Sequence, residues 1–283
     1  WDFELQPGNM LRPALQAQPD PDNNGAAEGW QHDTGEAGWV AADGSWLPEP
    51  IRPGDAPWYW LRAAVTCEVG AHPRRIVVDS RDFLELFVNG RPAEQAPGAP
   101  LWAEENVHYD VDGLFREGAN TIHIRVRNSK YNDPRVAAFP GRTDRLLQPV
   151  VVLGEFRVEG QTLLAPRPQV RVDQPWEQQG MPQVAGVGIY RRRLATEAGA
   201  RVFLRLPEVV DAVEVFVNGQ SAGRTAWPPY VFDLTDLLHG GENELEIRVS
   251  NTLGNLITET YGGAQPPEYP TSGLQAAPQL LFL

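Results

Sequence analysis

Aromatic side chains beside carboxylates and amides are the residues of this chain that could do chemistry. Sugars are held by the faces of aromatic rings, while amide, carboxylate and guanidinium groups bind their hydroxyls. Trp102 lies in a long loop and is followed closely by Glu104 and Asn106. We expect Trp102 to stack on a sugar, with Glu104 and Asn106 binding its hydroxyl groups. Other loop residues expected to share that role are Arg81, Tyr131 and Arg142.

A second aromatic pair, Trp227 and Tyr230, lies in the corresponding loop of the later half of the chain. Loops at one end of a β-sandwich are a common place for ligand binding, so both residues are candidate sugar contacts. The alternative for each tryptophan is that it fills a core or an interface, because tryptophan is usually well buried. An aromatic residue that binds sugar should therefore be exposed and flanked by polar groups.

Carboxylate pairs that could hydrolyse a glycosidic bond are numerous but not distinctive. Such catalysis needs two carboxyl groups at a defined separation on either side of the sugar. With 37 Asp and Glu residues in the chain, neighbouring pairs arise without any catalytic role. The sequence also lacks the repeating strand–helix pattern from which a catalytic barrel is built. We therefore expect no active site in these residues and no required cofactor.

The run Asp20–Gly25 places several oxygen ligands close together, and oxygen is the donor that calcium prefers. One prediction is a structural calcium ion held by Asp20, Asp22 and Asn24. The other is a turn rich in Asp and Asn, which needs no metal. The five histidines are scattered without paired spacing, which disfavours zinc.

Composition restricts the partners of the chain. A net charge of −13 disfavours nucleic acid and anionic membranes, both of which select basic surfaces. No run of about 18 apolar residues is present, so no membrane-spanning segment is expected. The first residues are not a signal peptide, which suggests a removed leader or a longer parent chain. The single cysteine, Cys67, is expected to be a buried and unreactive thiol.

The elements that must position these residues occur twice. The stretches Leu84–Ala93 and Val213–Ala222 are alternating apolar strands that run into Asn-Gly, a strong signal for a type I′ hairpin turn. The turn asparagines are 129 residues apart (218 − 89), whereas Asn128 and Asn251 are 123 apart (251 − 128). The first copy therefore has six extra residues (129 − 123) after its turn. Two copies of one unit indicate two domains of one fold.

Short strands separated by turn residues predict an all-β chain of two tandem jelly-roll β-sandwiches. The first domain is predicted to span residues 1–162, beginning with a strand near Trp1–Leu5. The second is predicted to span residues 163–283 and to end in a closing strand. In both copies the alternation predicts a buried triplet before the turn, made of Leu84, Leu86 and Val88 in the first and of Val213, Val215 and Val217 in the second.

The order of these pieces resembles the galactose-binding-like, jelly-roll accessory domains of glycoside hydrolases. Domain one, with WYWLRAAV, LFVNGRPA and YDVDGLFREGANTIHIRVRNS, is similar to the sugar-binding domain of family 2 enzymes. Domain two, with VFVNGQSAG, PPYVFDLTDLL and ENELEIRVSNTLGNLI, is similar to the carboxy-terminal domain of family 106 α-L-rhamnosidases. Structural calcium is common in such domains where the first and last strands meet, which implies Glu155 as a further ligand of the calcium site.

The resemblance and the loop aromatics together predict a non-catalytic, carbohydrate-binding part of a secreted glycoside hydrolase, extracellular or periplasmic. The acidic loop around Trp102 favours a neutral oligo- or polysaccharide, because a uronate would meet like charge there. A catalytic domain in the parent chain is the other expected partner. The alternative is a structural scaffold that packs on such a barrel and binds no ligand. A scaffold should expose a broad apolar patch.

Overall fold

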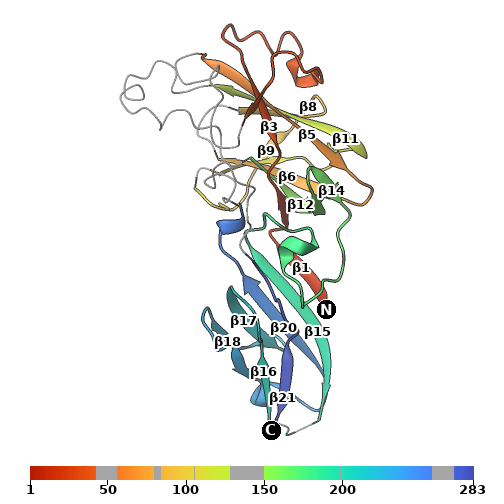
Figure 1. Ribbon diagram of the computed structural model, residues 1–283, viewed down its shortest axis with the longest axis vertical. Coiled ribbons are helices and arrows are strands. Elements are labelled where there is room, and N and C mark those ends of the chain that lie inside the picture. Colours follow the sequence, from red (N-terminus) through yellow and green to blue (C-terminus); the bar gives the residue numbers. More distant parts are fainter. Residues whose placement is uncertain are drawn as a thin grey trace, which may run out of the picture. The chain divides into compact units, whose positions relative to one another are not determined.

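Alternating apolar and polar residues form the strands of this chain, and the computed structural model shows an all-β protein (Figure 1). The structure describes residues 1–42, 56–79, 84–104, 106–127, 150–197, 199, 201–256 and 271–283. The predicted fold class, all-β with sandwich domains, is confirmed by the packed sheets. Within the described residues no helix is both long enough and apolar enough to cross a membrane.

The chain folds as two compact units. Unit I comprises Leu11–Ala165. Unit II comprises the described residues of Trp1–Met10, Pro166–Thr258 and Pro267–Leu283. In the part of the chain that the structure describes, the chain passes from unit II to unit I near Leu11 and returns to unit II after Ala165.

The described residues of unit I form two sheets. The larger sheet contains β3 (Leu15–Pro19), β4 (Val40–Ala42), β5 (Trp58–Cys67), β7 (Leu84–Val88), β8 (Arg91–Pro92), β11 (Gly118–Arg127), β13 (Arg157–Glu159) and β14 (Thr162–Leu164). The second sheet contains, in spatial order, β2 (Asn9–Leu11), β12 (Val150–Glu155), β6 (His72–Asp79), β10 (Asn106–Asp110) and β9 (Glu94–Ala96). A 3₁₀ helix, η1 (Trp30–His32), lies in the segment between β3 and β4.

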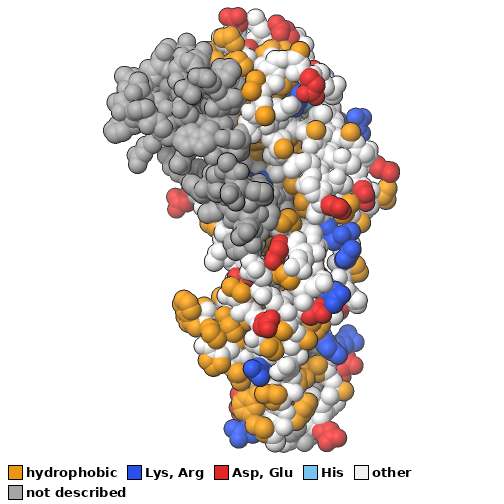
Figure 2. Space-filling model, viewed as in Figure 1, with side chains coloured by type: hydrophobic (Ala, Val, Ile, Leu, Met, Phe, Trp, Pro, Cys, Tyr) orange, Lys and Arg blue, Asp and Glu red, His pale blue; other side chains and the backbone are white. Residues whose placement is uncertain are grey.

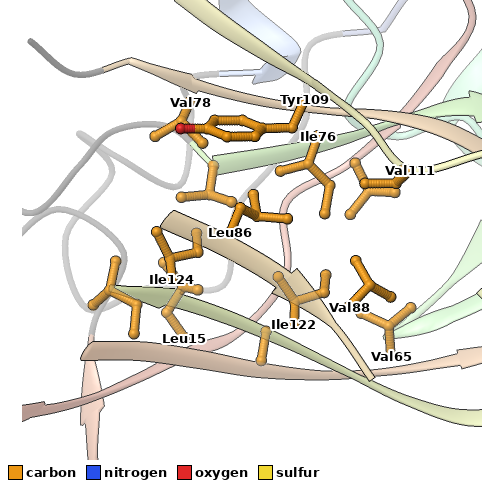
Figure 3. Packing of buried hydrophobic residues seen from close by; sticks show 14 of the residues in the cluster. Leu15, Val65, Ile76, Val78, Leu86, Val88, Tyr109, Val111, Ile122 and Ile124 are labelled. Carbon is orange, nitrogen blue, oxygen red and sulfur yellow. The ribbon is translucent and has the colours of Figure 1, made fainter. Parts of the chain in front are cut away.

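Side chains from the inner faces of these two sheets meet in the core of unit I (Figure 3). The predicted triplet of β7 is buried, and Ile122 and Ile124 of β11 lie beside it. Ile76 and Val78 of β6 face them from the second sheet. Burying each such side chain stabilises the fold by about 1.5–3 kcal/mol, so the core fixes which face of each strand points inward.

Unit II also has two sheets. The larger contains, in spatial order, β1 (Asp2–Gln6), β15 (Val187–Thr196), β20 (Gly241–Ser250), β17 (Ala212–Val217) and β18 (Gln220–Thr225). The smaller contains β19 (Val231–Asp233), β16 (Val202–Arg205) and β21 (Gln279–Phe282), the predicted closing strand. Two 3₁₀ helices, η3 (Trp176–Gln179) and η4 (Thr235–Leu237), lie in its loops. The predicted triplet of β17 is buried in the core of this unit.

The Asn-Gly turns have the backbone that was predicted for them. Asn89 and Gly90 have φ values of 53° and 74°, and Asn218 and Gly219 have φ values of 50° and 78°. A type I′ turn requires positive φ at both central residues. The side chain of Asn89 donates to the carbonyl oxygen of Leu114, and that of Asn218 donates to the carbonyl oxygen of Leu237. Backbone geometry and these internal bonds account for both asparagines without a ligand.

Strand β1 lies in unit II, which corrects the prediction that residues 1–162 form one domain. The predicted strand near Trp1–Leu5 forms, but it pairs with β15 over Asp2–Gln6. In unit I the equivalent place beside β5 is taken by β3. The order β3-β5-β11-β7-β8 in unit I thus matches β1-β15-β20-β17-β18 in unit II. Each sandwich needs a strand at this edge, and the chain supplies the one for unit II from its first residues.

Candidate functional site

The loop around Trp102 in unit I is built by Asn106. Its side-chain carbonyl oxygen accepts hydrogen bonds from the backbone N–H groups of Leu101 (2.9 Å), Trp102 (3.0 Å) and Ala103 (3.3 Å). These three hydrogen bonds hold the loop in place. The buried Nδ2 group of Asn106 has no hydrogen-bond partner among the described residues. Trp102 is half-buried and Glu104 is exposed.

The other residues expected around Trp102 lie outside the described residues; they are Arg81, Tyr131 and Arg142. The sugar site of unit I therefore remains a prediction that rests on Trp102, Glu104 and the Nδ2 group of Asn106.

The Asp20 carboxylate organises the turn for which calcium was one prediction. One oxygen accepts the backbone N–H of Asn24 (2.8 Å). The other accepts the backbone N–H of Gly25 (3.1 Å) and the indole N–H of Trp60 (3.0 Å). Asp20 is only 2% exposed, so these donors satisfy a carboxylate that would otherwise be buried at high cost.

The remaining residues of the expected calcium set are not assembled around Asp20. Asp22 and Asn24 are exposed, and Glu155 forms an ion pair with Arg74 at 2.7 Å. Across the described ranges no group of three or more His, Cys, Asp or Glu side chains is placed to hold a metal ion. The alternative prediction, a turn folded by its own Asp and Asn side chains, accounts for the geometry of this segment.

Trp227 in unit II has the exposure expected of a sugar-binding aromatic residue. Its side chain is 77% exposed, although the residue is large and apolar. The hydroxyl of Thr225 accepts the backbone N–H of Trp227 (3.2 Å) and donates to its carbonyl oxygen (2.9 Å). Pro228 and Pro229 follow and restrict the backbone further. The indole is thus presented to solvent on a loop with few backbone alternatives.

Tyr230 supports this loop from inside and does not face solvent, which corrects its prediction as a ligand contact. Its ring is packed in the core of unit II and is 6% exposed. Its hydroxyl donates to the carbonyl oxygen of Ala226 at 3.3 Å. Burial raises the pKa of Tyr230, which keeps the phenol protonated as a donor. The alternation of β19 decides this outcome, because Tyr230 and Phe232 both point inward.

A cavity of about 400 Å³ lies beside the Trp227 loop, on the strands β17, β18 and β20. It is lined by Ala212, Val213, Glu214, Arg224, Thr225, Ala226 and Ser250. Ala226 and Thr225 belong to the segment that immediately precedes Trp227. In Figure 2, hydrophobic side chains are exposed over the region of β17 and β18. The cavity therefore combines apolar surface with polar groups.

Glu214 and Arg224 supply the charges of this cavity. They lie directly opposite each other on β17 and β18. In the part of the chain that the structure describes, neither side chain forms an ion pair or a hydrogen bond. A free carboxylate accepts and a free guanidinium donates, so the pair can bind the hydroxyl groups of a neutral ligand from both sides.

Sequence reasoning missed Glu214, Arg224 and Ser250 because it searched the loops. The signal was present in the alternation of β17, since the burial of Val213 and Val215 places Glu214 on the outer face. What the alternation does not reveal is that Arg224 stands opposite Glu214. That pairing depends on the register of β17 against β18, which shifts between Val215 and Phe216.

A second cavity, of about 320 Å³, lies in unit I between the turn after β5 and the segment after β10. Its lining includes Cys67, Glu68, His72, Phe115 and Arg116. Cys67 is buried, as predicted, and burial raises the pKa of its thiol. A protonated thiol is a poor nucleophile, so this cavity offers no nucleophilic chemistry.

Three acceptors in unit II hold consecutive backbone N–H groups. Glu177 accepts from Ser272 (3.4 Å), Asp211 from Gly273 (3.1 Å) and the hydroxyl of Tyr190 from Leu274 (3.3 Å). Burial raises the pKa of Asp211 to about 6, with a contribution from the nearby charge of Glu177. Burial also raises the pKa of Glu177.

The raised pKa of Asp211 predicts that stability decreases as the pH rises from about 4 to about 6. The folded state binds the proton of Asp211 more tightly than the unfolded chain does. The stability that this proton contributes is therefore complete below about pH 4 and lost above about pH 6. Asp211→Asn removes the charge and keeps an acceptor for Gly273. We expect the variant to be more stable than the parent by about 1 kcal/mol at pH 7.5, after allowance for solvent screening. Urea denaturation should show no difference near pH 4, and an equal gain at both pH values would contradict the prediction.

Comparisons with known proteins find glycoside hydrolases. No family model matches the chain. A putative beta-glucuronidase of Formosa agariphila is 28% identical over 120 residues, which are 39% of this chain and 10% of that protein. The solved rhamnosidase of Novosphingobium sp. PP1Y is 19% identical, with a TM-score of 0.34, over 79% of this chain and 22% of that one. A glycosyl hydrolase family 2 member of Bacteroides cellulosilyticus is 14% identical, with a TM-score of 0.36, over 88% of this chain and 32% of that one.

This chain therefore spans only a small part of the length of each of these relatives.

Proposed function

We propose that this chain is a non-catalytic, carbohydrate-binding part of a glycoside hydrolase. Its glycan site is the Trp227 site, which we define as Trp227, Glu214, Arg224 and the cavity between β17 and β18. The observation that carries the proposal is the exposed indole of Trp227 on a restrained loop that follows directly on Thr225 and Ala226, two residues that line the cavity together with Glu214 and Arg224. The partial similarity to a putative beta-glucuronidase supports the hydrolase context. In that context the protein acts outside the cytoplasm, where polysaccharides are met.

The chemistry of the Trp227 site matches a neutral sugar. The indole face can stack on the C–H face of a pyranose ring, and Glu214 and Arg224 can accept from and donate to its hydroxyls. One carboxylate and one guanidinium give the site no net charge, so it has no preference for an ionic ligand. The described residues of the site contain no arrangement of paired, perturbed carboxylates that would add hydrolysis.

Trp227→Ala is expected to weaken glycan binding about ten- to a hundredfold, because loss of one stacking face removes on the order of 1–3 kcal/mol. The measurement is isothermal titration calorimetry against the glycans that a glycan array returns for the parent chain. Val210→Ala is the matched control, because Val210 is another exposed apolar residue of unit II, at 61% exposure. Trp102→Ala tests the site predicted for unit I in the same assay. Unchanged affinity in Trp227→Ala would remove Trp227 from the site.

A structural scaffold is the second candidate function, and exposed apolar side chains at the smaller sheet of unit II favour it. Val231 of β19 is 45% exposed, and Leu281 and Phe282 of β21 are 41% and 59% exposed. A scaffold would cover these residues with a catalytic domain and bind no glycan. The array and the Trp227→Ala titration separate the two functions, since a scaffold gives no binding to lose.

A further inference from the structure

The two larger sheets carry the same side chains at equivalent positions of their outer faces. Arg125 of β11 stands opposite Glu85 of β7, and Arg248 of β20 stands opposite Glu214 of β17. Two residues after these glutamates, Phe87 of β7 and Phe216 of β17 lie on the same outer face. The matching strand order and register allow the two outer faces to be compared residue by residue.

In unit I this outer face is covered by the chain itself. The covering segment, which we call the strap, is Asp20–Ala42. Its Trp39 ring lies 4.5 Å from the guanidinium carbon of Arg62 on β5, and its Trp30 ring packs against Trp60 with the ring centroids 6.2 Å apart. The result is an outer face whose side chains are buried under two indole rings.

The strap also supplies oxygen atoms to the polar groups of that face. The carbonyl oxygen of Gly35 accepts from Arg62, and the side-chain oxygen of Asn23 accepts from Arg125 at 2.5 Å. The carbonyl oxygen of Asp33 lies 3.0 Å from Nε2 of His123. The face of unit I thus binds indole rings and oxygen acceptors of its own chain, and a sugar chain shares with that segment the oxygen acceptors.

In unit II the equivalent guanidinium groups are accessible to solvent. The side chain of Arg248 is 41% exposed, against 14% for Arg125. The side chain of Arg191 is 36% exposed, whereas that of Arg62, its equivalent in unit I, is 6% exposed. The guanidinium carbon of Arg248 lies 4.3 Å from the centroid of the Phe216 ring, so the arginine is held flat over an aromatic face.

Most charges of the open face form ion pairs, and carboxylates slightly outnumber guanidinium groups. Glu246 pairs with Arg191 at 2.6 Å and with Arg248 at 2.7 Å, and Arg191 also pairs with Glu4 at 2.9 Å. The same face also carries Glu214, Glu242 and Glu244 as well as Arg193 and Arg224, so that five carboxylates meet four guanidinium groups. A polyanion or a strongly charged peptide gains little from such a surface, whereas neutral hydroxyl groups can bridge its donors and acceptors.

We infer that the open face of β15, β20 and β17 continues the Trp227 site and takes a neutral oligosaccharide, with Phe216 and Arg248 contacting sugar residues beyond the one that stacks on Trp227. The inference rests on the proposed function. From β18 to β15 the face crosses three strand spacings, or roughly 14 Å, which is wider than one pyranose ring. The ligand class is therefore a chain of several neutral sugars and not a monosaccharide.

The test is a chain-length series with the parent chain and three variants. The probes are β-linked oligomers of glucose, xylose and galactose from the monosaccharide to the hexasaccharide, with oligoalginate as the anionic comparison, all measured by calorimetry. Arg248→Gln and Phe216→Ala alter the open face. Arg205→Gln is the matched control, because Arg205 is an exposed arginine on β16 of the other sheet. Thermal unfolding of each variant reports whether it folds.

We expect Arg248→Gln and Phe216→Ala to weaken binding of the longer oligomers about tenfold and to leave the shortest bound oligomer unchanged. Trp227→Ala should weaken every length. If Trp227→Ala weakens binding but both face variants bind the hexasaccharide as the parent does, the inference is wrong and the proposed function stands. If the parent binds no probe, both are overturned. A preference for oligoalginate would overturn the assignment of a neutral ligand.

Discussion

Asp20→Ala is expected to destabilise unit I by about 3–5 kcal/mol, because it leaves three N–H donors, two of them on buried residues, without an acceptor. These donors are the backbone N–H groups of Asn24 and Gly25 and the indole N–H of Trp60. Trp60 is completely buried, so water cannot replace the lost oxygen without opening the strap. Urea denaturation followed by tryptophan fluorescence measures the effect.

The control for Asp20 is Asp22→Ala, since Asp22 is exposed in the same turn and its replacement should change stability by less than about 0.5 kcal/mol. Repeating both measurements in EDTA distinguishes the two explanations of this turn. If the carboxylate stabilises the turn through its N–H donors, EDTA changes neither the free energy of unfolding of the parent chain nor the difference in that free energy between the variants. A large loss of parent stability in EDTA would restore the calcium prediction.

Asn243→Ala is expected to destabilise unit II by about 3 kcal/mol, because its amide joins several segments of the unit. The Asn243 carbonyl oxygen accepts from the backbone of His239 (3.0 Å) and from Asn218 (2.8 Å). Its Nδ2 donates to Thr196 (2.9 Å) and to the carbonyl oxygen of His239 (2.8 Å). Asn243 is 1% exposed, so each group left behind is buried.

Asn120 is the equivalent residue of unit I and provides an internal comparison. Its carbonyl oxygen accepts from Arg116 and Asn89, and it too is 1% exposed. Hydrogen-exchange mass spectrometry should show faster exchange in unit II for Asn243→Ala and in unit I for Asn120→Ala. Gln220→Ala, at an exposed position of β18, should leave exchange unchanged. Equal effects of either asparagine variant on both units would contradict the assignment of each amide to its own unit.

Local patterns in the sequence predicted the strands and the buried faces. Alternation identified the buried triplets of β7 and β17, and Asn-Gly identified both turns, because side-chain period and positive φ are properties of a few neighbouring residues. The buried thiol of Cys67 followed from the same pattern. These features depend on contacts that any sandwich of this kind makes.

Properties that depend on distant partners were not predictable. Alternation shows that Trp1–Leu5 is a strand but not that its neighbour is β15, about 185 residues later in the chain. The composition of Asp20–Gly25 suits a metal and a turn equally, and the sequence does not show that the Asp20 carboxylate accepts the indole N–H of Trp60 from 40 residues away. Tyr230 and Trp227 lie in the same loop in the sequence, yet the side chain of Trp227 is exposed to solvent and that of Tyr230 is buried in the core.

The place of β1 has a consequence for how the protein can be made and divided. Unit II is discontinuous in the chain, with unit I inserted after its first strand. During synthesis β1 has no pairing partner until β15 leaves the ribosome, whereas unit I can complete its own sheets before then. A truncation at residue 165 would separate β1 from β15 and leave a ten-residue strand with an unpaired edge, which invites aggregation. A permuted gene that joins residues 1–8 to the end of unit II would restore that edge, leave β2 in the sheet of unit I, and let each half be studied alone.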